Sequence, residues 1–184
     1  MIRPISEPPK QPSWVMERTP GRGEGLRFFA EKLAGLFGAE RLRGWTVLDV
    51  GGGDGWLRDF LSVREYWCLD PHSYDSPDTF QEGWYYRVVG SAERLDFPDE
   101  RFDLVVSKQT LVHFDDPARA AREMLRVAYR GVVIRQEFPE SPIGWKGHSR
   151  VTIDAPDDIL EHLSRLGWTT TYDGTDFVSR RDVG

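Results

Sequence analysis

The stretch Val47-Leu48-Asp49-Val50-Gly51-Gly52-Gly53-Asp54-Gly55 decides the fold of this chain. An apolar run that contains an acid is followed by glycines at alternate positions, which is typical of a strand that ends at a tight turn before a helix. Glycines at Gly51, Gly53 and Gly55 permit backbone angles closed to other residues and let a ligand touch the main chain. The pattern therefore predicts a cofactor loop behind a buried strand.

The composition fits a single globular domain. The chain has 184 residues, of which 39% are hydrophobic and 12% aromatic, enough to bury one core. The lone Cys68 excludes an internal disulfide and a cysteine metal cluster, and we expect no metal site. No apolar run reaches the roughly 20 residues that span a bilayer, and no amino-terminal segment has the order of a secretory signal. We therefore expect a cytoplasmic protein without a membrane partner.

The formal charge of −6 argues against a broad nucleic-acid surface, which would need clustered Lys and Arg. The first 13 residues carry four prolines and little apolar content, which predicts an irregular arm at residues 1–20. Residues 21–184 are then expected to form one domain. The oligomeric state stays open between a monomer and a homodimer.

Strand and helix patterns alternate along the rest of the chain. The expected strands lie at 46–50, 66–69, 84–89, 102–107 and 131–135, with a closing hairpin of 168–172 and 177–179 around Asp173-Gly174. The expected helices lie at 24–37, 55–63, 76–82, 117–128 and 156–166. This order predicts an α/β fold of the Rossmann-like, doubly wound type: a mostly parallel seven-stranded sheet with an antiparallel last strand and helices on both faces.

Three sequence elements carry a resemblance to a known family. The first is the acid-x-Gly-x-Gly-x-Gly order of residues 49–55, and the second is Leu69-Asp70, an acid that closes the next strand. The third is Gly90-Ser91-Ala92-Glu93 with residues 95–107, followed by residues 113–117. With these elements the chain resembles the class I S-adenosylmethionine-dependent methyltransferases, in particular the small-molecule subgroup with a minimal seven-stranded core. The resemblance implies methyl transfer from S-adenosylmethionine to an O, N or C nucleophile of a small-molecule acceptor.

The resemblance also implies roles at the carboxyl edge of the sheet, where open α/β folds bind ligands. Asp70 is expected to accept both ribose hydroxyls, while the glycine-loop amides and the positive end of the next helix receive the methionyl carboxylate. Asp49 is expected to orient the loop and to help hold the amino group. The complete expected cofactor set is Asp49, Gly51, Gly52, Gly53, Gly55, Asp70, Pro71, His72, Ser91, Ala92, Glu93 and Ser107.

The sequence departs from the family in its adenine loop. Ser91 stands where an acid commonly follows the glycine, which shifts the expected adenine contacts to Glu93, Asp96 or water. If the acceptor needs a general base, His113 is the first candidate and His148 the second, because histidine titrates near neutral pH. Local packing explains His113 equally well.

Two other functions do not fit the sequence, and a third stays open. A nicotinamide-dependent oxidoreductase would need a small residue where Trp56 stands. Methylation of a nucleic-acid adenine would need an Asn-Pro-Pro-aromatic signature where Ser107-Lys108-Gln109-Thr110 stands. A non-catalytic S-adenosylmethionine-binding or regulatory module stays open as the alternative, because methyl transfer needs few protein groups.

Overall fold

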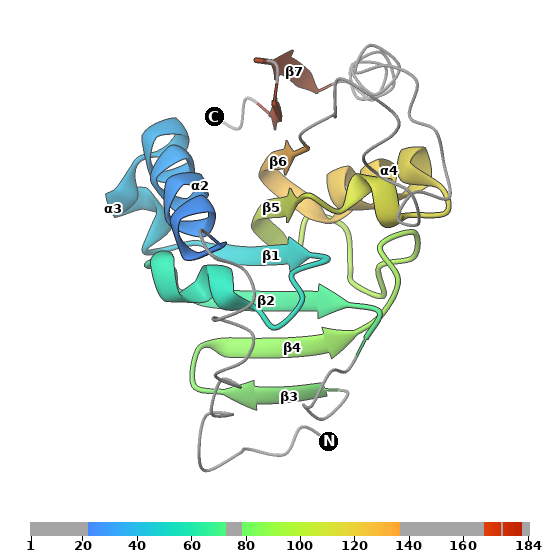
Figure 1. The fold of residues 1–184 in the computed structure, drawn as a ribbon, viewed down its shortest axis with the longest axis horizontal. Helices are drawn as coiled ribbons and strands as arrows, with labels where there is room; N and C mark the ends of the chain where they lie inside the picture. The colour runs from blue at the N-terminus through green and yellow to red at the C-terminus, as the bar shows by residue number, and fades with distance from the viewer. Residues whose placement is uncertain (1–21, 73–78, 137–167, 174, 182–184) are drawn as a thin grey trace.

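The computed structural model describes residues 22–72, 79–136, 168–173 and 175–181. These residues form one sheet of eight strands in the order β3-β4-β2-β1-β5-β6-β8-β7 (Figure 1). The strands are β1 Thr46–Val50, β2 Glu65–Asp70, β3 Thr79–Glu82, β4 Tyr85–Val89, β5 Phe102–Lys108, β6 Ala128–Arg135, β7 Thr169–Tyr172 and β8 Asp176–Arg180. The helices are α2 Arg22–Phe37, α3 Ala39–Leu42 and α4 Pro117–Val127, with 3₁₀ turns η1 Trp56–Phe60 and η2 Leu111–His113.

Five neighbouring strands, β4, β2, β1, β5 and β6, run parallel. Every residue of β1 is buried, which explains why its sequence is a nearly continuous apolar run. Figure 1 shows that the carboxyl ends of β1, β2 and β4 point to the same edge of the sheet. The loops that follow these strands are therefore neighbours in space.

The two faces of the sheet carry separate cores. On one face, Phe29 and Leu33 of α2 pack with Val47 of β1. On the other, Met124 of α4 packs with Leu48 and neighbouring apolar residues. Alternate residues of β1 thus point to opposite layers, as the pleat of a strand requires. The predicted α/β fold with helices on both faces is confirmed.

The closing hairpin is also confirmed. Strand β8 runs antiparallel to both β6 and β7. The Asp173 carboxylate accepts hydrogen bonds from the backbone amides of Thr175 and Asp176 at 3.1 and 2.9 Å, which fixes the turn between the strands. Lys32 of α2 forms ion pairs with Asp173 and Asp176, so the hairpin is tied to a helix.

Two predicted helices were wrong. Residues 79–82, expected within a helix at 76–82, form strand β3, which pairs antiparallel with β4 and adds an eighth strand. The physical reason is Gly83, whose φ of 57° allows a tight turn directly into β4. Residues 55–63 form only the five-residue turn η1, because β2 begins at Glu65 and leaves little chain for a helix.

Three expectations lie outside the described residues or are not tested by them. The arm at residues 1–20 and the helix at 156–166 fall outside the described ranges. The single domain at 21–184 stays a prediction. Among the described residues, no helix combines the length and the apolar character that crossing a membrane requires.

Candidate active site

The glycine loop follows β1 at the carboxyl edge of the sheet. Gly51 has a φ of 73° and Gly55 a φ of 72°, angles that L side chains rarely adopt. A Cβ on Gly51 would lie 2.5 Å from the Thr110 methyl carbon, and one on Gly55 would lie 2.6 Å from the Tyr85 hydroxyl oxygen. Both the backbone angles and the space therefore require glycine at these positions.

The amide groups of this loop are largely engaged within the protein. Gly51 and Gly52 donate to the Leu69 carbonyl at 2.7 and 3.3 Å, and Gly55 donates to Gly52 at 2.9 Å. The next element, η1, has five residues and no strong helix dipole. The expected reception of a carboxylate by these amides and by a helix terminus stays a prediction. In the structure, the glycines let the loop turn and pack closely.

Asp70 ends β2 beside the glycine loop and is 6% exposed. Its Oδ2 accepts the amide hydrogen of Gly53 at 2.9 Å, and its Oδ1 accepts that of His72 at 3.0 Å. Each carboxylate oxygen has two lone pairs, so both oxygens can accept a further donor. The predicted position of Asp70 at the carboxyl edge is thus found, with its two oxygens fixed by two different loops.

Asp49 lies within β1, below the glycine loop. The hydroxyl of Tyr66 donates to its Oδ2, and a Cβ on Gly52 would lie 2.6 Å from the same oxygen. Burial raises the pKa of Asp49 to about 6, and the charge of Asp70 adds to this shift; the Tyr66 hydrogen bond and the charge of Lys108 oppose it. Asp49 therefore supports the loop from beneath and can change its charge near neutral pH.

Side chains from β2 and β4 hold the loop carbonyls. Arg87 donates to the Gly53 carbonyl at 2.8 Å, and the Cys68 thiol lies 3.4 Å from the same oxygen. Tyr85 donates to the Asp54 carbonyl at 3.3 Å. Burial raises the pKa of the Cys68 thiol well above its usual value, so this cysteine is a packing group rather than a nucleophile.

Sequence reasoning missed Tyr66, Tyr85 and Arg87. The available signal was a charged residue inside a buried strand, since Arg87 interrupts the run Tyr85–Val89. Buried charges require partners, so such a residue near a glycine loop could have been flagged.

The turn after β5 meets the glycine loop from the other side. The Ser107 hydroxyl donates to the Val50 carbonyl at 3.0 Å and shares a hydrogen bond with the Thr110 hydroxyl. Both side chains are buried. Ser107 thus joins the ends of β1 and β5, and its place in the expected cofactor set stays a prediction.

The expected adenine loop is fastened to α4. Glu93 accepts the amide hydrogen of Asp116 at 2.9 Å, so one of its oxygens is occupied by the helix start rather than directed to a base. Arg126 donates to the carbonyls of Leu95 and Phe97 at 2.7 and 2.8 Å. Its hydrogen bonds to Glu123 lower the pKa of that carboxyl. This bracing fixes the backbone around Ala92, which is 5% exposed.

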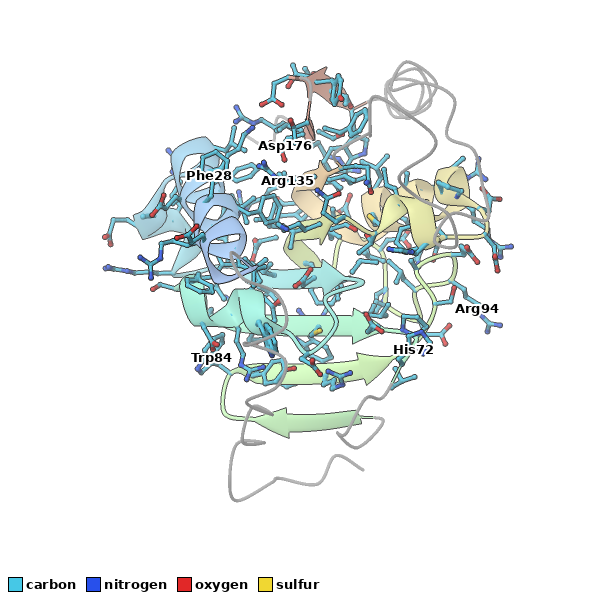
Figure 2. The ribbon with its side chains drawn as sticks, in the orientation of Figure 1. Phe28, His72, Trp84, Arg94, Arg135 and Asp176 are labelled. Atoms are coloured by element: carbon cyan, nitrogen blue, oxygen red, sulfur yellow. The ribbon has the colours of Figure 1, made fainter. Side chains whose placement is uncertain are left out.

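The remaining expected residues divide into exposed and undescribed ones. Pro71, His72 and Ser91 are exposed, and Figure 2 shows His72 and Arg94 at the carboxyl edge, with Trp84 at the opposite edge. His113 is exposed in η2, just after β5. His148 lies outside the described residues.

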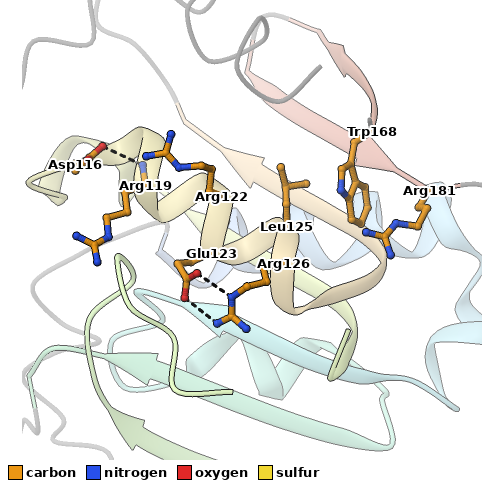
Figure 3. Close-up of a pocket in the computed structure, with 8 residues that line it drawn as sticks. All are labelled: Asp116, Arg119, Arg122, Glu123, Leu125, Arg126, Trp168 and Arg181. Carbon is orange, nitrogen blue, oxygen red and sulfur yellow. Dashed lines mark hydrogen bonds and ion pairs between the residues drawn. The ribbon is translucent and has the colours of Figure 1, made fainter. Parts of the chain in front are cut away.

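A separate cavity of about 700 Å³ lies along α4 (Figure 3). Two of its lining arginines have acidic partners: Arg126 binds Glu123 at 2.8 Å, and Arg181 pairs with Glu100 and lies over Trp168, with its guanidinium carbon 4.6 Å from the ring centroid. It lies away from the glycine loop, and we do not assign it to the active site. Within the described ranges, no three His, Cys, Asp or Glu side chains are grouped to hold a metal ion.

The known proteins that this chain resembles are methyltransferases. Residues 48–134 match the family described as methyltransferase domain. Over 93 residues, covering 48% of the chain and 36% of the relative, the sequence is 37% identical to an uncharacterized methyltransferase of Mycobacterium sp. (strain KMS). Over 133 residues, covering 66% of the chain and 36% of the relative, it is 30% identical to the chloroplastic 2-methyl-6-phytyl-1,4-hydroquinone methyltransferase 2 of Oryza sativa subsp. japonica.

The chain thus spans only about a third of the length of these curated relatives. Among solved structures, it shares the fold of a candidate S-adenosyl-L-methionine-dependent methyltransferase from Methanococcus maripaludis. That similarity has a TM-score of 0.67 at 17% identity and covers 98% of both chains.

Proposed function

We propose that this chain, which belongs to the class I S-adenosylmethionine-dependent methyltransferases, binds S-adenosylmethionine at the carboxyl edge of β1, β2 and β4 and methylates a small-molecule acceptor. The acceptor nucleophile is an oxygen, nitrogen or carbon atom. The rice relative is named as a hydroquinone methyltransferase, which supports a small molecule rather than a macromolecule as the acceptor. The cytoplasmic location remains a prediction from the sequence.

The observation that carries the proposal is the geometry of Asp70. Its carboxylate is buried at the end of β2, is fixed by amides of two loops, and keeps lone pairs for two more donors. A vicinal diol such as that of ribose supplies two such donors. The adjacent residues Gly51, Gly52 and Gly53 have no side chains that would keep a ligand away from their backbone. The residues present therefore fit the sugar of the cofactor.

S-adenosylmethionine supplies a methyl group already activated by a sulfonium leaving group. The task left to the protein is alignment, because well-oriented reactants can gain about 7 to 11 kcal/mol over a bimolecular encounter. In this proposal Asp70 holds the ribose, Asp49 attracts the amino group, and Ala92 borders the adenine. His113 is positioned after β5 to accept a proton from the acceptor where one must be removed.

Titration calorimetry with S-adenosylmethionine and S-adenosylhomocysteine tests the proposal. We expect binding by the wild-type protein and loss of binding in Asp70→Ala. Glu40→Ala is the control, because this carboxylate is exposed on α3, pairs with Arg43 at 3.0 Å, and belongs to an element that contributes no residue to the expected cofactor set. Undiminished binding by Asp70→Ala would contradict the ribose assignment.

A measurement of turnover distinguishes a methyltransferase from the non-catalytic binding module. A screen of metabolite pools with labelled methyl donor should yield a methylated product, and His113→Ala should slow its formation without changing donor affinity. Unchanged turnover would remove His113 from the mechanism. Donor binding without any product would favour the non-catalytic module.

A further inference from the structure

Arg87 is a charged side chain in the middle of β4 and is only 1% exposed. The strand register places it beside Cys68 of β2, which in turn pairs with Asp49 of β1. The three residues form a row across the sheet below the glycine loop. Burial of a guanidinium is costly unless its donors are hydrogen-bonded, so the partners of Arg87 indicate its role.

Arg87 joins two loops that follow different strands. Its Nη1 donates to the carbonyl of Gly53, after β1, at 2.8 Å. Its Nη2 donates to the carbonyl of His72, after β2, at 2.9 Å. A planar guanidinium can make two such bonds in fixed directions, whereas an ammonium group cannot reproduce the fork.

Asp70 holds the same two residues by their amide groups. The amide of Gly53 donates to Oδ2 and that of His72 donates to Oδ1, at 2.9 and 3.0 Å. Both residues therefore have their N–H bound by Asp70 and their C=O bound by Arg87. The four hydrogen bonds close a ring that fixes the spacing of the two loops and the orientation of the Asp70 carboxylate.

We propose that Arg87 is a positioning residue for the cofactor, which fixes the backbone of Gly53 and His72 so that Asp70 presents both oxygens to the ribose. This inference rests on the proposed function. Arg87 acts through the backbone of the two loops. Removing its fork takes the guanidinium donors away from both carbonyls, leaves that of Gly53 with the weak Cys68 thiol at 3.4 Å, and frees the loops to move relative to Asp70.

Titration calorimetry with S-adenosylhomocysteine tests this role in Arg87→Met and Arg87→Lys. We expect Arg87→Met to weaken binding about ten-fold or more, the equivalent of losing one hydrogen bond from a charged donor. Arg87→Lys keeps the charge but loses the fork, so it should also bind more weakly than the wild type. Arg101→Met is the control: this arginine binds Glu65 at 3.2 Å and lies over Trp67, on residues outside both loops.

A double-mutant cycle with Asp70→Asn separates positioning from general stability. If Arg87 acts through Asp70, Arg87→Met should add little to the loss of affinity that Asp70→Asn causes alone. Fully additive losses would overturn the inference. Thermal unfolding of each variant shows whether it is folded, and Arg87→Lys decides the question if Arg87→Met does not fold.

The possible outcomes distinguish this inference from the proposed function. Absence of binding by the wild-type protein would overturn both. Binding by the wild type with unchanged affinity in the Arg87 variants would overturn the positioning role alone.

Discussion

Replacement of Asp49 by Asn should change how the stability of the protein depends on pH. Asp49 is 4% exposed, and burial raises its pKa from 3.8 to about 6. The folded state therefore binds the proton more tightly than the unfolded state. The contribution of this group to stability is fully present below pH 4 and is lost as the pH rises through 6.

The magnitude follows from the shift of about two pKa units. At 1.36 kcal/mol per unit the full effect is about 3 kcal/mol; because the unfolded group is already partly ionised at pH 4, the wild-type protein should lose about 2 kcal/mol of unfolding free energy from this group between pH 4 and pH 7. Asn cannot ionise, and its amide oxygen can still accept the Tyr66 hydroxyl. The free energy of unfolding of Asp49→Asn, relative to the wild type, should therefore rise by about 2 kcal/mol over that range.

Urea denaturation at several pH values between 4 and 7.5 measures this difference. Asp59→Asn, which removes an exposed carboxylate from η1, controls for a simple change of net charge. Parallel curves of unfolding free energy against pH for the wild type and Asp49→Asn would refute the reasoning, because they would show that Asp49 does not titrate in this range in the folded state.

Cofactor binding should show the opposite dependence. If Asp49 attracts the amino group, it must be ionised, so the affinity of the wild type for S-adenosylhomocysteine should be about ten-fold lower at pH 5 than at pH 7. Asp49→Asn should bind more weakly at pH 7 and lack this dependence. A wild-type affinity that is constant over this range would exclude Asp49 as the group that holds the amine.

Three further predictions concern the loop, the thiol and the adenine side. Gly51→Ala should destabilise the fold by at least about 1 to 2 kcal/mol in urea denaturation, because φ is 73° and the Cβ would lie 2.5 Å from Thr110. The control is Gly35→Ala in helix α2, where a Cβ meets nothing within 4 Å; this change should stabilise the fold. Cys68, which is fully buried, should react with iodoacetamide only after unfolding, as measured by mass spectrometry, and rapid alkylation of the native protein would contradict the packing. Arg126→Met releases the carbonyls of Leu95 and Phe97, so it should increase hydrogen exchange at Leu95 and weaken adenosine binding several-fold. Equal exchange rates in the variant and the wild type would show that α4 does not brace this loop.

The parts of the fold that were predicted from the sequence depend on local patterns. A buried apolar strand before alternating glycines fixed the position of β1 and its loop, and Asp173-Gly174 marked the closing hairpin. The expected helix at 76–82 failed because the sequence there has no strong period, and pairing with β4 after Gly83 decided its structure. Local helix and strand propensities carry no information about the pairing of residues 79–82 with β4, so they could not predict which structure forms.

Asp49 was expected to orient the loop, but its neighbours in the row could not be placed beside it from the sequence, because their positions depend on strand register. Asp49, Cys68 and Arg87 are far apart in the sequence, and only the pairing of β1 with β2 and of β2 with β4 brings them into one row. A shift of one residue in either pairing would turn Arg87 to the other face of the sheet. The sequence therefore identifies the loop and its acid, while the support beneath them requires the structure.

The short crossover after the glycine loop explains why that support is polar. If a long helix followed the loop, amide groups of its first turn would donate to the loop carbonyls. Here the loop is followed by η1, which has only five residues. The carbonyls of Gly53 and Asp54 are instead bound by Arg87 and Tyr85. Arg58 of η1 also donates to the Asp54 carbonyl, at 3.0 Å. Because unsatisfied buried carbonyls are costly, β4 carries hydrogen-bond donors at positions 85 and 87. Apolar substitutions at these two positions should therefore be harmful, even though they would suit an ordinary buried strand.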